Sequence, residues 1–211
     1  MENSQAREAI LSRIQRALRI SVPKPFTDHS EREVYVEADQ PLLETFSAEF
    51  TALQGHLVLC QNKADVLAGL SNLVQNRGWG DLYCQTPELY QTYDLNMAPY
   101  VTEKNPDGNN PAITDCEVLI ARTGTIVLTS AQASGRALPV HTPIHIVIAS
   151  VSQLVYDIKD AIGSITAKYG ANLPSALLFT SGPSRTGDIE KTLVMGVHGP
   201  VEVHVFLRTD Q

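Results

Sequence analysis

Hydrophobic and polar positions follow two periods along this chain, one typical of helices and one typical of strands. Near the N-terminus, QAREAILSRIQRALRI places its apolar side chains at helical spacing, which predicts an amphipathic helix. The next stretch, SVPKPF, holds two prolines that favour an extended linker. We therefore expect residues 1–25 to form a helical arm and linker, docked on the body or on another subunit, and residues 26–211 to form a single domain.

From about residue 41, short apolar runs alternate with segments of helical period. Such alternation predicts an α/β domain whose mostly parallel open sheet is covered by helices on both faces. The RTG turn between two strands also predicts a hairpin, which would add an antiparallel pair to that sheet. Helices are expected over 41–54, 63–78, 87–93, 151–170 and 188–196, and strands over 56–60, 81–85, 116–121, 125–130, 144–149, 175–180 and 201–208.

Composition narrows the class of protein. An apolar fraction of 43% with 18% charged residues is typical of a globular domain, and no apolar run approaches the roughly 18 residues of a membrane span. The first twenty residues lack the features of a signal peptide, so we expect a cytoplasmic protein. A formal net charge of −7 argues against nucleic acid or an anionic membrane as the main partner. The four arginines among the first twenty residues form either a solvated face or a contact for an acidic partner.

Metal and nucleotide motifs are missing from the sequence. Cys60, Cys84 and Cys116 are widely spaced within apolar runs, which is typical of reduced core thiols and not of a zinc or iron–sulfur site. In HTPIH, His141 and His145 have the spacing of a helical metal pair, but the proline between them and the following strand set them too far apart. The chain has no GxSxG, GxxxxGK[ST] or GxGxxG motif. We expect no metal and no evident cofactor on this chain.

The stretch SGPSRTGD, which follows the expected strand 175–180, is the strongest candidate for a binding site. Ligands of open α/β sheets bind at the carboxyl ends of strands, where glycines admit a close backbone approach and a following helix N-terminus attracts anions. Arg185 adds a fork suited to a carboxylate or phosphate, and Thr186 or Asp188 would cap the following helix. The alternative is a structural turn with Arg185 in an internal ion pair. The candidate ligand-binding residues of this loop are Ser181, Gly182, Ser184, Arg185 and Thr186.

Two further glycine-bearing loops carry a basic residue and suggest a shared pocket rim. They contribute Thr123, Gly124 and Thr125 from RTGT, and Arg136 from SAQASGRALP. In GVHGP, His198 stands between two glycines as a possible proton carrier, or as a hydrogen-bonded structural residue. The candidate acid–base residues are His198, Asp188 and Glu190, although no catalytic role is assigned to any of them.

The segments TGTIVLTS, SGR, PIHIVI, SGPSRTGDIE and GVHGP resemble the LUD-domain family and, within it, the lactate utilisation protein C group. The resemblance covers about residues 40–211, and the arm is also similar. It implies a fold similar to the ribose-5-phosphate isomerase and CoA-transferase superfamily. It also implies a part in the oxidation of L-lactate to pyruvate, together with partner subunits that carry the iron–sulfur clusters. The family commonly has glutamate where this chain has Arg122, which makes covalent CoA transfer doubtful and favours an anion-holding arginine.

Two hypotheses follow. In the first, the chain is a component of a lactate utilisation system that binds a small anion or docks on the iron–sulfur partners. In the second, it is a free-standing isomerase-like or CoA-transferase-like enzyme that acts on an anionic metabolite. The first hypothesis is favoured because the sequence does not supply a complete set of catalytic residues.

Overall fold

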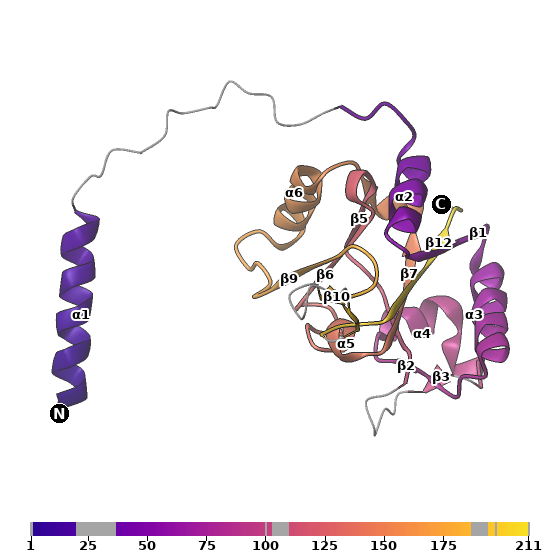
Figure 1. The fold of residues 1–211 in the computed structure, drawn as a ribbon, viewed down its shortest axis with the longest axis horizontal. Helices are drawn as coiled ribbons and strands as arrows, with labels where there is room; N and C mark the ends of the chain where they lie inside the picture. Colours follow the sequence, from indigo (N-terminus) through magenta and orange to yellow (C-terminus); the bar gives the residue numbers. More distant parts are fainter. Residues whose placement is uncertain are drawn as a thin grey trace. The chain divides into compact units, whose positions relative to one another are not determined.

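The computed structural model describes residues 2–19, 37–99, 101–102, 110–186, 194–196 and 198–210 (Figure 1). The chain divides into two compact units, residues 1–36 and 37–211. The first contains α1 (Glu2–Leu18), which confirms the predicted helix. Its apolar stripe, Ile10, Leu11, Ile14 and Leu18, is exposed. The expected boundary at residue 25 lies outside the described residues, and the docking of the arm stays a prediction.

The second unit contains short helices and strands in close alternation. Its helices are α2 (Leu42–Ala52), α3 (Lys63–Arg77), α4 (Pro87–Tyr93), α5 (Leu138–His141) and α6 (Ile158–Tyr169), with the 3-10 turns η1 (Leu95–Met97), η2 (Ala121–Thr123) and η3 (Val151–Gln153). Its strands are β1 (His56–Cys60), β2 (Leu82–Cys84), β3 (Val101–Thr102), β4 (Ala112–Thr114), β5 (Val118–Ile120), β6 (Thr125–Thr129), β7 (Ile144–Ser150), β8 (Leu154–Val155), β9 (Leu177–Thr180), β10 (Arg185–Thr186), β11 (Val194–Met195) and β12 (Glu202–Arg208).

The larger sheet is parallel, as the alternation of elements predicts. Its six strands have the order β1-β12-β7-β4-β2-β3, and every pair of neighbours runs in the same direction. The last described strand, β12, is the second strand from the edge of this sheet, between β1 and β7. Residues far apart in the sequence therefore meet at both ends of these strands.

A second sheet of four strands, in the order β8-β5-β6-β9, was not predicted as a separate layer. The hairpin of β5 and β6 is antiparallel, as expected, but it belongs to this sheet and not to the parallel one. The strand expected over 175–180 is β9, which runs antiparallel to β6. Its side chains are largely half-buried, and Phe179 is 44% exposed, unlike the fully buried central strands.

The layers follow from the alternation of side chains along the central strands. Ile146 and Ile148 of β7 pack with α3 and α4, whereas Val147 and Ala149 pack with α2 and the second sheet. The outer face of the second sheet packs against α6 through residues such as Ile165. One face of the parallel sheet is therefore covered by helices, and the other by α2 and a second sheet, as Figure 1 shows.

The helix predicted over 151–170 begins later, at Ile158. Ser150 and Gln153 do form a capping box, but it caps the short turn η3. The chain then extends through β8, because Leu154 and Val155 pair with β5. Asp157 starts α6 with a second capping box. Sheet pairing thus overrides the helical period of the first seven residues.

The helix predicted over 188–196 is wrong at its end, where Val194 and Met195 form β11. This strand pairs with Arg185 and Thr186 of β10, so Thr186 lies in a two-stranded hairpin and is not a helix cap. Residues 187–193 lie outside the described residues. Among those described, no helix combines the length and the apolar character needed to cross a membrane.

Two smaller predictions are confirmed. The side chain of Asn62 accepts a hydrogen bond from the main-chain N–H of Asp65 at 3.0 Å and caps α3, which ends at Gly78 in the left-handed conformation. The three cysteines are buried thiols. Burial raises the pKa of Cys60 and Cys116, which keeps both thiols protonated at neutral pH.

Candidate functional site

Two of the polar loops expected to share a pocket rim do converge. Because β9 runs antiparallel to β6, its carboxyl end lies beside the start of β6. The Ser181 hydroxyl is 2.6 Å from that of Thr125, which is 2.7 Å from the hydroxyl of Thr123. A chain of three hydroxyl groups therefore joins the 123–125 turn to the 181–184 loop.

The glycines of both loops permit close packing on the end of α2. Gly124 has a φ of +53°, and a Cβ there would lie 2.5 Å from the main-chain nitrogen of Phe50. Gly182 has a φ of +88°, and a Cβ would lie 2.7 Å from the carbonyl oxygen of Leu53. Distances this short exclude a side chain, so both glycines are required by contact with α2.

The guanidinium groups expected to hold an anion have partners within the chain. Arg185 donates a hydrogen bond of 2.7 Å to the Leu53 carbonyl, which ties the loop to the end of α2. Arg122 binds both oxygens of Asp157, at 2.7 and 3.1 Å. Hydrogen bonding from Arg122 holds the pKa of the Asp157 carboxyl below its ordinary value. Arg122 thus holds a carboxylate of its own chain, while Arg136 is exposed.

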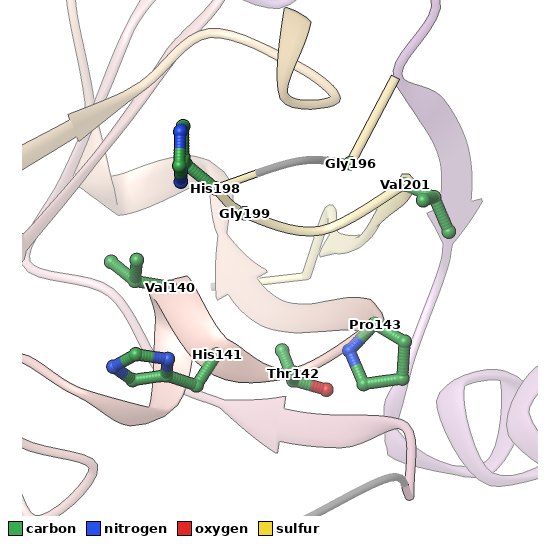
Figure 2. Close-up of a pocket in the computed structure, with 8 residues that line it drawn as sticks. All are labelled: Val140, His141, Thr142, Pro143, Gly196, His198, Gly199 and Val201. Carbon is green, nitrogen blue, oxygen red and sulfur yellow. The ribbon is translucent and has the colours of Figure 1, made fainter. Parts of the chain in front are cut away.

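Two neighbouring cavities lie beside the 181–184 loop. The larger, of about 440 Å³, is lined by Val140, His141, Thr142, Pro143, Gly196, His198, Gly199 and Val201. Figure 2 shows Gly196, His198, Gly199 and Val201 on one wall and residues 140–143 on the facing wall. The second, of about 290 Å³, is lined by Pro139, Val140, Phe179, Thr180, Ser181, Gly182, Pro183, Ser184, His198, Gly199 and Pro200. Because Val140, His198 and Gly199 line both, we call the two together the His198 pocket.

Main-chain hydrogen bonds hold the walls of the His198 pocket. Ser184 donates its N–H to the Pro200 carbonyl at 2.8 Å, and Gly196 donates to the Ser184 carbonyl at 3.0 Å. Val201 donates to the Pro143 carbonyl at 2.8 Å, which joins the residues that precede β12 and β7. The larger cavity therefore lies at the amino ends of these parallel strands, opposite to the end where open sheets usually bind ligands.

The pocket contains some of the predicted site residues and not others. Ser181, Gly182, Ser184 and His198 line it, and the 123–125 turn reaches it through Ser181. Among the lining residues of the described cavities, Arg185, Thr186 and Arg136 do not appear. Asp188 and Glu190 lie outside the described residues, and their proposed roles stay predictions.

Sequence reasoning missed the wall formed by residues 139–143. His141 was considered only as a metal ligand, and the proline-bearing segment before β7 gave no signal of binding. A useful signal was present, since HTPIH and GVHGP both place a histidine and a proline directly before a central strand. Such segments meet when the two strands are neighbours, as β7 and β12 are.

His141 and His145 do not form a metal pair. His145 is fully buried, and its Nε2 lies 2.8 Å from the Thr114 hydroxyl. Burial lowers the pKa of His145 to about 4, so its ring is neutral at physiological pH. In the part of the chain that the structure describes, the one group of three potential metal ligands is His56, Glu202 and His204.

Comparison with known proteins supports the family resemblance. Residues 109–207 match the LUD domain model, a range that holds every residue of the His198 pocket. The chain is 26% identical to a lactate utilization protein C from Anoxybacillus flavithermus, over 97% of this chain and 98% of that protein. It is 34% identical to the lactate utilization protein C of Bacillus subtilis, over 51% of this chain and 46% of that protein.

A solved structure shares the fold. A DUF162 family protein from Deinococcus radiodurans superimposes with a TM-score of 0.60 over 80% of this chain and 96% of that one, at 17% identity. At this identity the likeness shows the α/β fold alone. Residues 109–207 of this chain are therefore similar to the LUD domain, and nearly the whole chain is similar to a lactate utilization protein C.

Proposed function

We propose that this chain is a component of an L-lactate utilisation system and that it binds a small anionic metabolite in the His198 pocket. The observation that carries the first part is the near full-length alignment with a protein named lactate utilization protein C. In this proposal the oxidation of L-lactate to pyruvate takes place together with partner subunits that carry iron–sulfur clusters, in the cytoplasm.

The composition of the pocket supports binding of a small hydroxy or keto acid. Hydroxyl groups of Ser181 and Ser184 and the imidazoles of His141 and His198 supply donors for a carboxylate. The side chains of Val140 and Phe179 offer apolar contact for a short carbon chain. The volume of the larger cavity, about 440 Å³, lies within the range of small-molecule sites, and that of the second, about 290 Å³, lies slightly below it.

The enzyme hypothesis has no comparable support. A CoA-transferase-like exchange needs a carboxylate nucleophile in the 121–125 turn, and that turn instead holds Arg122, which is hydrogen-bonded to both oxygens of Asp157. His198 is exposed, and no hydrogen bond of its ring to a carboxylate is found among the described residues. We therefore propose a binding component and not a free-standing catalyst.

Ligand binding is tested by thermal unfolding of the full chain with L-lactate, pyruvate, D-lactate and inorganic phosphate. A ligand at one hundred times its dissociation constant stabilises the fold by about 2.7 kcal/mol, which raises Tm by roughly 5–10 °C. We expect this shift with L-lactate or pyruvate, and its loss in His198→Ala. Lys63→Ala, an exposed substitution at the start of α3, is the matched control and should keep the shift. No shift with any of these anions would contradict the binding proposal.

The role in lactate utilisation is tested separately. In a strain that lacks the corresponding gene, we expect growth on L-lactate to stop and to return when this chain is supplied. A tagged chain should also retain the iron–sulfur subunits during purification. Normal growth of the deletion strain on L-lactate would contradict this part of the proposal, whatever the outcome of the binding assay.

A further inference from the structure

Two histidines and a glutamate, none of which lines the His198 pocket, gather at the amino ends of β1 and β12. His56 is the first residue of β1 and Glu202 the first of β12, and the parallel register places His56 directly opposite His204. Residues 202 and 204 are two positions apart, so their side chains leave the same face of the strand. That face carries Phe206, which packs with α3.

The three side chains are close enough to bind one ion. One ligand atom from each lies within 4.8 Å of the others. The Nε2 of His204 and an oxygen of Glu202 are 3.1 Å apart. Two ligands of a tetrahedral zinc ion, each at about 2.0 Å from it, are themselves separated by about 3.3 Å. The donor atoms can surround a single ion once the stacked rings of His56 and His204 turn so that their planes converge on it.

Neighbouring side chains contact two of these ligands, His204 and Glu202. His204 is 3% exposed, its ring stacks on that of His56 with 4.5 Å between centroids, and the edge of Trp79 contacts it. Arg77, from the end of α3, binds both oxygens of Glu202 at 2.7 and 3.3 Å. A carboxylate has lone pairs for both an arginine and a metal ion, and partners of this kind orient metal ligands in known sites.

The positive charge of Arg77 disfavours binding of a cation beside it, but solvent weakens this repulsion. Its side chain is 42% exposed, so its charge is screened by solvent, and its guanidinium also lies 5.7 Å from the centre of the Trp79 ring. In the metal-free protein, Nε2 of His204 is hydrogen-bonded to Glu202, and binding requires the neutral tautomer with its hydrogen on Nδ1.

From this geometry we propose that His56, Glu202 and His204 bind one zinc ion, with a fourth position open to water. Two imidazoles and a carboxylate are a donor set that zinc accepts, and three protein ligands leave one position for a small ligand. His56 is exposed, which gives the ion an entry path. The site shares no residue with the His198 pocket and does not depend on the function proposed above.

The test uses the full chain, freed of metal with a chelator and dialysed. Isothermal titration with ZnCl₂ should give one site, and Co²⁺ should produce the visible absorption of a tetrahedral complex. His56→Ala is the main variant, because its side chain is exposed and its loss removes one ring contact, the stacking on His204. We expect it to lower the affinity for Zn²⁺ by at least about 10-fold, the smallest effect seen when even an outer partner of a zinc ligand is lost. Glu202→Gln should weaken binding in the same direction.

His141→Ala is the control, since it removes an exposed histidine outside the cluster and should bind zinc as the unchanged chain does. Circular dichroism of each variant establishes that it is folded. Absence of zinc binding by the unchanged chain would overturn the proposal. So would equal affinity of the unchanged chain and folded His56→Ala, which would show that zinc binds elsewhere and that the cluster is a structural hydrogen-bonded group.

Discussion

Acid should destabilise this domain partly through one buried imidazole, that of His145 in β7. The side chain is fully buried at the centre of the parallel sheet, with Nε2 2.8 Å from the Thr114 hydroxyl. Its Nδ1 has no hydrogen-bond partner within the described residues. A proton added to this ring would be buried without an opposite charge, which explains why burial lowers the pKa of His145 to about 4.

The direction and size of the effect follow from the two pKa values. In the unfolded chain the imidazole titrates near its ordinary value of 6.5, so the unfolded state takes up the proton first as the pH falls. The contribution to stability is therefore complete above pH 6.5 and is lost as the pH falls from 6.5 towards 4. Between pH 6.5 and pH 4 the loss in the free energy of unfolding amounts to about 3 kcal/mol. Between pH 7.5 and pH 5 it amounts to about 2 kcal/mol.

Urea unfolding between pH 5 and pH 7.5 measures this contribution when the unchanged chain is compared with His145→Gln. Glutamine keeps a polar group for Thr114 but does not titrate. We expect the variant to lose about 2 kcal/mol less than the unchanged chain over this range. Burial also lowers the pKa of His204 to about 4, so His204 contributes to the acid sensitivity of both chains. Its contribution cancels when the variant is compared with the unchanged chain. His141→Gln, at an exposed position, should leave the pH profile unchanged. Parallel profiles for His145→Gln and the unchanged chain would refute the argument.

Two further substitutions test the packing of the candidate site. Gly182→Ala should lower the free energy of unfolding by at least about 2 kcal/mol and Tm by at least roughly 4 °C, because φ is positive and Cβ would meet a carbonyl at the end of α2. Gly80→Ala, with open space around it, should change stability by no more than about 0.5 kcal/mol. Arg122→Met should lower the free energy of unfolding by about 1–3 kcal/mol at pH 7, because buried Asp157 loses its partner. Arg7→Met, at an exposed position, is the control and should not lower it. Because Arg122 lowers the pKa of Asp157, the stability that this pair supplies is present above the ordinary carboxyl pKa and is lost in acid, so the variant should be less sensitive to acid in urea titrations. A Gly182→Ala chain as stable as Gly80→Ala, or an acid profile unaltered in Arg122→Met, would contradict these arguments.

Much of the fold was accessible from the sequence because local signals agree with it. The Asn62 cap, the glycine at the end of α3 and the apolar runs of β7 and β12 place these elements almost to the residue. The second sheet was not accessible. A short apolar run such as that of β9 has the same pattern in a parallel or an antiparallel sheet, and only its partner decides which.

The same difficulty limits the prediction of the site. The 181–184 loop was expected at the carboxyl edge of a parallel sheet, but β9 places it beside β6 and the end of α2. Arg185 was predicted to hold an anionic ligand or to form an internal ion pair, but sequence gives no information about its acceptor, which is a main-chain carbonyl. The facing wall at residues 140–143 becomes part of the pocket only because β7 and β12 are neighbours in the sheet.

The start of β12 links the two sites of this domain and also separates them. Val201 lines the larger cavity, and the next residue, Glu202, belongs to the proposed zinc cluster. Successive side chains of a strand leave opposite faces. Val203 packs with the second sheet and His204 lies against Trp79, so the pocket and the cluster occupy opposite faces of the same sheet edge. Since neither shares a side chain with the other, zinc and a bound anion should stabilise the fold additively. A stabilisation by both together that differs from the sum of the two would instead indicate that the start of β12 moves when either one binds.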